Sequence, residues 1–153
     1  MNVLEVNKHL EELGLTLGSA ESFTGGLFAS TITSVGGASK VFKGSFVTYA
    51  TEEKVNLLCI PRYIVEEHGV VSVIVARMMC ENARKILGVD VCVSFTGNAG
   101  PDAMEGKPVG EVYIGIAYKE NSEVYPLHLE GSRNEIQQQA VEFALKKLTL
   151  LKK

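Results

Sequence analysis

The feature that most constrains this chain is a turn near its amino terminus, Ala20-Glu21-Ser22-Phe23-Thr24-Gly25-Gly26. An extended run over residues 15–21 leads into the turn, and apolar residues at helical spacing follow it. A strand-to-helix turn built from Thr-Gly-Gly presents backbone N–H groups that suit a phosphate or a developing oxyanion. Ser22 and Thr24 would face the same space. The simpler interpretation is a helix N-cap, because Ser and Thr are preferred at that position.

The order of elements along the rest of the chain predicts the fold. Helices are expected over residues 2–13, 25–34, 52–58, 61–69, 73–87 and 135–151, and strands over 15–21, 44–50, 90–96, 110–119 and 122–130. Ser132 and Glu135 have the spacing of a capping box at the start of the last helix. Strands that alternate with helices, followed by a hairpin, favour a three-layer α/β/α sandwich. We therefore predict an α/β fold with a mixed, mostly parallel sheet and an antiparallel hairpin near the C-terminus.

Composition narrows the class of protein. A chain of 153 residues is expected to form one domain, residues 1–153, and its 46% apolar and 22% charged residues are typical of a globular protein. The net charge of −3 argues against a nucleic-acid or anionic-membrane surface. No signal peptide or membrane-spanning run is recognisable, so we expect a cytoplasmic protein. Cys59, Cys80 and Cys92 fit no zinc pattern and are expected to be reduced core residues.

Candidate chemistry gathers where the predicted strands end. In an α/β sheet the site lies at the carboxyl ends of the strands, and loops 20–26, 49–54 and 96–108 meet there. Lys54 falls in the first turn of a helix that Thr51 would cap, where the helix dipole and burial should lower its pKa. A neutral lysine can act as general base for a serine, and Tyr49 could relay the proton or hold the lysine. Alternatively, Glu52, Glu53 and Lys54 are a solvated helix face.

Loop 97–108 is rich in glycine and proline and is unusually charged. Gly97 and Gly100 allow close approach of the backbone, and Lys107 adds a positive charge for an anionic ligand. Asp102 and Glu105 are most simply surface turn residues. The loop does not match a Walker A motif, since Pro108 follows Lys107. No histidine has a partner at metal-ligand spacing, so neither a metal nor another cofactor is expected.

Five blocks of sequence together resemble one family. They are Ala20-Glu21-Ser22-Phe23-Thr24-Gly25-Gly26; Gly37-Ala38-Ser39; Phe46-Val47-Thr48-Tyr49 with Lys54; His68-Gly69-Val70-Val71-Ser72; and Thr96-Gly97-x-Ala99-Gly100-Pro101 with Lys107-Pro108-Val109-Gly110. In this order and spacing they resemble the CinA C-terminal-domain family of bacterial nicotinamide-nucleotide amidases. The resemblance covers nearly the whole chain.

The resemblance implies deamidation of nicotinamide mononucleotide to nicotinate mononucleotide and ammonia. It carries the family's serine, tyrosine and lysine positions onto Ser22, Tyr49 and Lys54. The substrate-binding positions expected beside them are Thr24, Gly25, Gly26, Ala38, Ser39, Thr96, Gly97, Gly100 and Lys107. Two departures stand in the last block. Asn98 replaces a bulky aliphatic residue, and Ala103-Met104 replaces a Gly-Gly pair.

Three functions fit the sequence to different degrees. The leading one is an amidase in which Ser22 attacks the carboxamide or positions water, Lys54 moves the proton, and Tyr49 assists. The second is a competence- or damage-associated module that binds a nucleotide or a protein without turnover. A phosphohydrolase is the weakest, because no carboxylate cluster would hold its metal. The expected partner is a small nucleotide, and short helices at the edges of the domain favour a homo-oligomer.

Overall fold

A five-stranded sheet with the order β2-β1-β3-β4-β5 forms the centre of the computed structural model, which describes residues 2–153. The strands are β1 (Leu17–Glu21), β2 (Phe42–Val47), β3 (Val91–Gly97), β4 (Glu111–Tyr118) and β5 (Asn121–His128). The pairs β1–β2 and β1–β3 are parallel, whereas β3–β4 and β4–β5 are antiparallel. The predicted mixed sheet with a C-terminal hairpin is confirmed.

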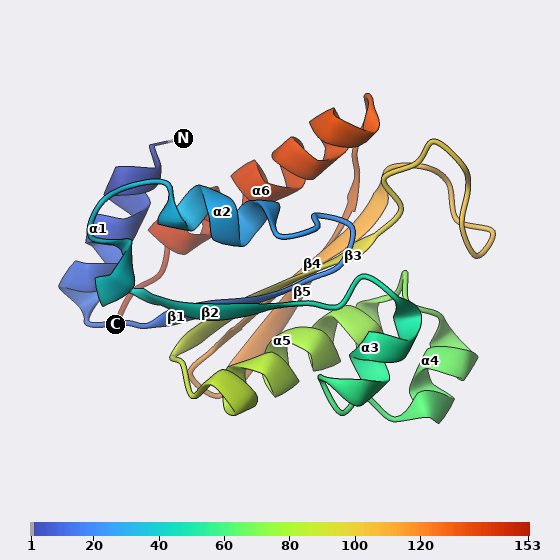
Figure 1. Ribbon diagram of the computed structural model, residues 1–153, viewed down its shortest axis with the longest axis horizontal. Coiled ribbons are helices and arrows are strands. Elements are labelled where there is room, and N and C mark those ends of the chain that lie inside the picture. The colour runs from blue at the N-terminus through green and yellow to red at the C-terminus, as the bar shows by residue number, and fades with distance from the viewer. Residues whose placement is uncertain (1) are drawn as a thin grey trace.

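Helices cover both faces of this sheet, which gives the predicted three layers (Figure 1). One face carries α1 (Val3–Leu13), α2 (Leu27–Thr33) and α6 (Arg133–Thr149), and the other carries α3 (Thr51–Asn56), α4 (Arg62–His68) and α5 (Val73–Leu87). A single 3-10 turn, η1 (Ala38–Lys40), precedes β2. Each face has its own apolar core, and Phe28 of α2 meets Phe95 of β3 in the first of them. Within residues 2–153, no helix is long and apolar enough to cross a membrane.

Local chemistry explains most of the element boundaries. Gly14 and Gly88 end α1 and α5 in the left-handed conformation, which glycine adopts without a steric cost. The capping box at Ser132 and Glu135 is present at the start of α6. The largest boundary difference is in β2, which ends at Val47 rather than at residue 50. Thr51 is the first residue of α3 and not its cap.

Two sequence interpretations are wrong at this level. Cys59 is exposed, with a φ of 57°, because it lies in the tight turn after α3 and not in a core. Cys80 and Cys92 are buried as expected, and burial raises the pKa of the Cys80 thiol to about 12. The N-cap interpretation of Ser22 and Thr24 also fails, because α2 begins after Gly26 and no side chain caps it.

The connections between strands create a crevice at one edge of the sheet. β1 lies between β2 and β3, and its end at Glu21 pairs with Val47 and Phe95, so β1 and β2 end together and β3 continues to Gly97. The chain passes from β1 to β2 through α2 on one face and from β2 to β3 through α3, α4 and α5 on the other. Such a reversal of direction opens a crevice beyond the strand ends, where α/β proteins bind ligands.

Candidate active site

Ser22 and Lys54 form a hydrogen-bonded pair in this crevice. Ser22 follows the last residue of β1, and Lys54 lies on α3, beyond the end of β2. The Lys54 Nζ atom donates to the Ser22 Oγ atom at 3.0 Å and to the Thr48 carbonyl at 2.8 Å. The Lys54 side chain is almost completely buried, with 1% of its surface exposed. The arrangement holds a lysine amine and a serine hydroxyl in contact, away from bulk water.

Burial is the main influence on the charge of Lys54. It lowers the pKa of Lys54 from 10.5 to about 8, and the Glu105 carboxylate opposes this by favouring the ammonium form. The predicted helix-dipole effect is wrong as a cause, because Lys54 lies in the last turn of the six-residue α3. Glu52 is turned away and pairs with Arg62, and Glu53 accepts a hydrogen bond from Asn56. The carboxylate that matters thus comes from a distant loop.

Glu21 organises the turn that holds Ser22. Its fully buried carboxylate accepts hydrogen bonds from the backbone amides of Gly26, Phe28 and Ala29 and from the Thr24 hydroxyl. The amide of Gly25 donates to the Ser22 carbonyl. The amides of Gly25 and Gly26 and the Thr24 hydroxyl are therefore not available to a substrate, which corrects the sequence prediction. The protein's own carboxylate takes the place expected for an anionic ligand.

Two backbone amides of the same turn donate neither to the Glu21 carboxylate nor to the Ser22 carbonyl. Across residues 2–153 the backbone N–H groups of Phe23 and Thr24 have no hydrogen-bond acceptor. They directly follow Ser22 in the chain. An amide that follows the nucleophile is a common element of an oxyanion hole.

A small cavity of about 140 Å³ opens beside Ser22. It is lined by Ser22, Phe23, Tyr49, Gly97, Asn98, Ala99, Met104 and Arg133. Tyr49 is 61% exposed, and its hydroxyl accepts a hydrogen bond from Arg133 at 2.7 Å. No hydrogen bond joins Tyr49 to Ser22 or Lys54 among the described residues, so the expectation that Tyr49 holds the lysine is wrong.

Sequence reasoning did not identify Arg133 as a site residue. Arg133 is the first residue of α6, and it also donates to the Gly100 carbonyl. It reaches the crevice because β5 ends at the same sheet edge as β3, so α6 begins there. The capping box located this helix start in the sequence. The capping box and the predicted hairpin together contained enough information to predict that Arg133 lies near the site.

The loop between β3 and β4 forms the far wall of the cavity, and Asn98 holds it together. The buried Asn98 side chain accepts from the Gly100 amide and donates to the Lys107 carbonyl. Asn98, which replaces the bulky aliphatic residue of the family, thus stabilises the loop, and its side-chain amide forms both of these hydrogen bonds within the loop. Gly97 is required for packing, because a Cβ atom there would lie 2.6 Å from the Val112 Cα atom. The hydroxyl of Thr96 donates to the Val70 carbonyl.

Among the described residues, Gly97 is the one predicted binding residue that lines the cavity, and the residues that do not line it include Lys107, Ala38 and Ser39. The ammonium of Lys107 lies 3.6 Å from the Glu111 carboxylate and does not line the cavity. Ala38 and Ser39 belong to η1, which precedes β2 and lies at the amino ends of the strands. The length of β1 separates them from Ser22, and five strand residues at about 3.3 Å each span roughly 15 Å. Within one chain, the expectation that Ala38 and Ser39 bind the same substrate is therefore wrong.

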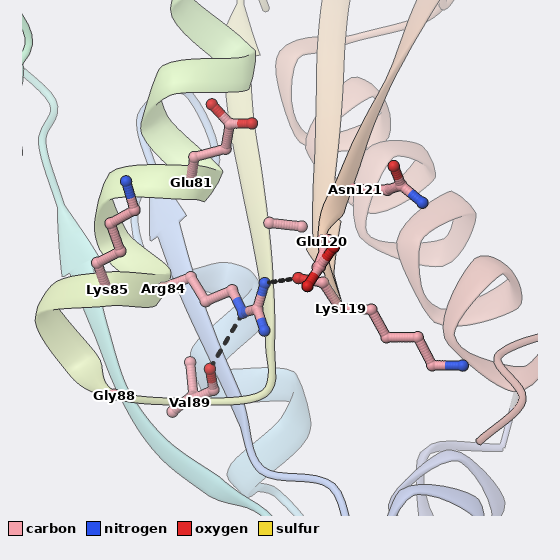
Figure 2. Close-up of a pocket in the computed structure, with 9 residues that line it drawn as sticks. Glu81, Arg84, Lys85, Gly88, Val89, Lys119, Glu120 and Asn121 are labelled. Atoms are coloured by element: carbon pink, nitrogen blue, oxygen red, sulfur yellow. Dashed lines mark hydrogen bonds between the residues drawn. The ribbon is translucent and has the colours of Figure 1, made fainter.

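A larger cavity of about 510 Å³ lies at the opposite end of the sheet, between α5 and the β4–β5 turn. Figure 2 shows Arg84 reaching across it, where Arg84 donates to the carbonyls of Val89 and Lys119. The described residues that line it include no hydroxyl, thiol or imidazole. This cavity therefore has no counterpart of the hydrogen-bonded Ser22–Lys54 pair. Within residues 2–153, no group of three or more His, Cys, Asp or Glu side chains is placed to hold a metal ion.

Comparison with known proteins shows the family of the chain. The family model described as the CinA C-terminal domain matches residues 2–151. The chain belongs to this family. A protein of Streptococcus pneumoniae named as competence-damage inducible is 46% identical over 140 residues, which are 91% of this chain and 34% of that protein. A similarly named protein of Geobacillus is 45% identical over 146 residues, with 92% and 35% coverage. This CinA-family chain thus spans about a third of the length of these curated relatives.

Solved structures of the CinA superfamily share the fold. The superfamily protein from Escherichia coli is 30% identical, with a TM-score of 0.94, over 97% of this chain and 88% of that chain. A competence/damage-inducible protein from Agrobacterium tumefaciens is 31% identical, with a TM-score of 0.90, over 95% and 90% of the two chains. The CinA-family fold thus extends over nearly all of the chain.

Proposed function

We propose that this CinA-family chain is an amidase that hydrolyses the carboxamide of nicotinamide mononucleotide to nicotinate mononucleotide and ammonia. The observation that carries the proposal is the 3.0 Å contact between the Lys54 Nζ and Ser22 Oγ atoms in a buried setting. With a pKa of about 8, roughly a tenth of Lys54 is neutral at pH 7 and can accept a proton. A pair of this kind activates a serine for attack on an acyl carbon.

The proposed reaction uses the pair twice. Neutral Lys54 takes the hydroxyl proton as the Ser22 Oγ atom bonds to the carboxamide carbon, and the amides of Phe23 and Thr24 hold the resulting oxyanion. The carbon–nitrogen bond then breaks, and Lys54 returns the proton to the leaving nitrogen, which departs as ammonia. Water that loses a proton to Lys54 bonds to the acyl carbon, the bond from this carbon to the Ser22 Oγ atom breaks, and Lys54 returns the proton to that oxygen as the acid is released. A Ser22 that only positions water is the alternative, and mass spectrometry of a rapidly quenched reaction would distinguish the two.

The size of the cavity indicates how a nucleotide would lie. A volume of about 140 Å³ is well below the roughly 300–1,000 Å³ of pockets that enclose a whole ligand. The cavity therefore suits the carboxamide end, with the ribose and phosphate outside it. Arg133 is the cation that lines this cavity, and we propose it, in place of Lys107, as the contact for the phosphate.

Ammonia release from nicotinamide mononucleotide tests the proposal directly. The purified chain should produce ammonia and nicotinate mononucleotide in equal amounts, and Ser22→Ala should not. Tyr63→Phe serves as a matched control, since Tyr63 is 65% exposed on α4 and does not line the cavity. If the wild-type chain binds the nucleotide in calorimetry without releasing ammonia, the amidase proposal is refuted in favour of a binding module.

A further inference from the structure

The tip of the β3–β4 loop is a two-residue hairpin whose first turn residue is a glutamate. Met104 and Lys107 pair through reciprocal backbone hydrogen bonds, and Glu105 and Gly106 connect them with φ angles of 55° and 70°. Two successive positive φ angles are typical of a type I′ turn, which favours Asn, Asp or Gly. A glutamate in the left-handed region is strained, so other contacts must hold it there.

Those contacts are made by the Glu105 carboxylate. Its two oxygens accept hydrogen bonds from the amides of Val70 and Val71, both at 3.0 Å. These amides belong to the segment that joins α4 to α5, 34 and 35 residues away in sequence. The same carboxylate packs so closely on Gly69 that a Cβ atom there would lie 2.7 Å from a carboxylate oxygen. Glu105 therefore attaches the hairpin to the segment that joins α4 to α5.

The attached hairpin contributes one residue to the cavity beside Ser22. Met104, which precedes Glu105, lines the cavity beside Ser22. Glu105 is also the charged group that acts electrostatically on Lys54. Glu105 thus anchors the hairpin that carries Met104 of the cavity wall, and it acts electrostatically on the buried amine of Lys54.

We propose that Glu105 is a positioning residue for the reaction: its carboxylate holds hairpin 104–107 against the segment that joins α4 to α5, and its charge acts on the buried Lys54 amine. The role rests on the proposed amidase function, but the attachment of the hairpin does not. Glu105 touches neither the substrate cavity nor the reacting atoms. It acts through Met104 and Lys54.

The other charged and titratable groups on the elements around Lys54 form hydrogen bonds or ion pairs with partners other than Lys54. The Glu21 carboxylate of β1 accepts hydrogen bonds from backbone amides at the start of α2. The Tyr49 hydroxyl, beyond β2, accepts a hydrogen bond from Arg133 of α6. On the face of α3 and α4, Glu52 and Arg62 pair with each other.

Glu53 accepts from Asn56 on its own helix. Among the described residues, Glu105 is the charge that acts on the pKa of Lys54, which burial lowers to about 8. Removing the Glu105 charge should therefore lower that pKa further.

Amide exchange tests the attachment of the hairpin without any need for activity. In Glu105→Gly the left-handed backbone is no longer strained, so the hairpin can persist while the carboxylate is lost. Hydrogen exchange of the Val70 and Val71 amides, measured by NMR, should become faster by about tenfold or more. Asp102→Asn is the matched control, because Asp102 lies in the same loop and makes no hydrogen bond or ion pair within residues 2–153. Unchanged exchange in Glu105→Gly would overturn the proposal.

The pH dependence tests the effect on Lys54. In Glu105→Gln the titration of Lys54, followed by NMR of its labelled ε-carbon, should move to lower pH by about half a unit or more. The rise of kcat/KM with pH should move by the same amount, whereas Asp102→Asn should leave both unchanged. An equal shift in the two variants would refute a specific role for Glu105. A wild-type chain without ammonia release would refute the amidase function, and the exchange and titration results would still decide the role of Glu105.

Discussion

Replacing Lys54 by methionine should remove a pH dependence from the stability of this protein. Burial lowers the pKa of Lys54 from 10.5 to about 8 in the folded state, and the side chain regains its ordinary pKa when the chain unfolds. Between these two values the unfolded chain binds more protons than the folded one. The wild-type free energy of unfolding should therefore rise with pH through this window. The stabilisation is complete above the unfolded pKa and is lost as the pH falls through about 8.

The magnitude follows from the difference between the two pKa values. A shift from 10.5 to about 8 corresponds to roughly 3 kcal/mol at 1.36 kcal/mol per unit. About 2.5 kcal/mol of this should appear between pH 7 and pH 10. Lys54→Met also removes the donor to the Ser22 hydroxyl and the Thr48 carbonyl. The loss of these hydrogen bonds should lower the free energy of unfolding of Lys54→Met by the same amount at every pH. The change with pH in the difference between the two free energies therefore reports the ionisation of Lys54.

Urea unfolding followed by circular dichroism at several pH values from 7 to 10 measures both curves. Wild type should gain about 2.5 kcal/mol relative to Lys54→Met over this range. Lys8→Met provides the control, because Lys8 is exposed on α1 and its replacement should leave the pH dependence unchanged. Parallel curves for wild type and Lys54→Met would show that Lys54 keeps an ordinary pKa, and the proposed base would lose its physical basis.

Four further predictions concern the site. Ser22→Ala should lower ammonia release by about 100-fold or more, with the free energy of unfolding changed by less than about 1 kcal/mol in a urea titration; wild-type turnover would exclude Ser22 as the nucleophile. Lys54→Arg should not restore the activity lost in Lys54→Met, because arginine does not give up its proton, and an active arginine variant would exclude Lys54 as the base. Arg133→Met should reduce the preference for nicotinamide mononucleotide over nicotinamide riboside, measured as a ratio of kcat/KM values, and an unchanged ratio would place the phosphate elsewhere. Gly97→Ala should destabilise the fold by about 1–3 kcal/mol or more in the same titration, because its Cβ would meet the backbone of Val112 at 2.6 Å; a neutral effect would show that β3 and β4 can separate.

The prediction of which residues lie close together was most accurate for residues that follow the ends of strands. Ser22 and Lys54 were chosen from their positions after predicted strands, and the structure brings them to 3.0 Å. It was least accurate where a residue's partner is distant in sequence. Glu105, placed on a surface turn, instead binds amides 34 and 35 residues away.

Backbone amides were a second source of error, because their availability depends on the buried groups around them. The amide of Gly26 and the hydroxyl of Thr24 are hydrogen-bond donors of the kind that an anion site needs, but both already donate to the Glu21 carboxylate. Glu21 was visible in the motif. Nothing in a one-dimensional pattern reports that its side chain turns toward the start of α2 and not toward a ligand.

The sequence by itself determined the layers, the order of the elements, most of their boundaries and the sheet edge at which the chemistry lies. These properties follow from hydrophobic periodicity, caps and glycine stops, which act over a few residues. The tertiary structure alone decided that Met104 lines the cavity, that Ala38 and Ser39 lie at the other end of the sheet, and that burial, rather than the helix dipole, lowers the pKa of Lys54. Those properties depend on strand register and on desolvation, and both arise only when segments far apart in the chain pack against one another.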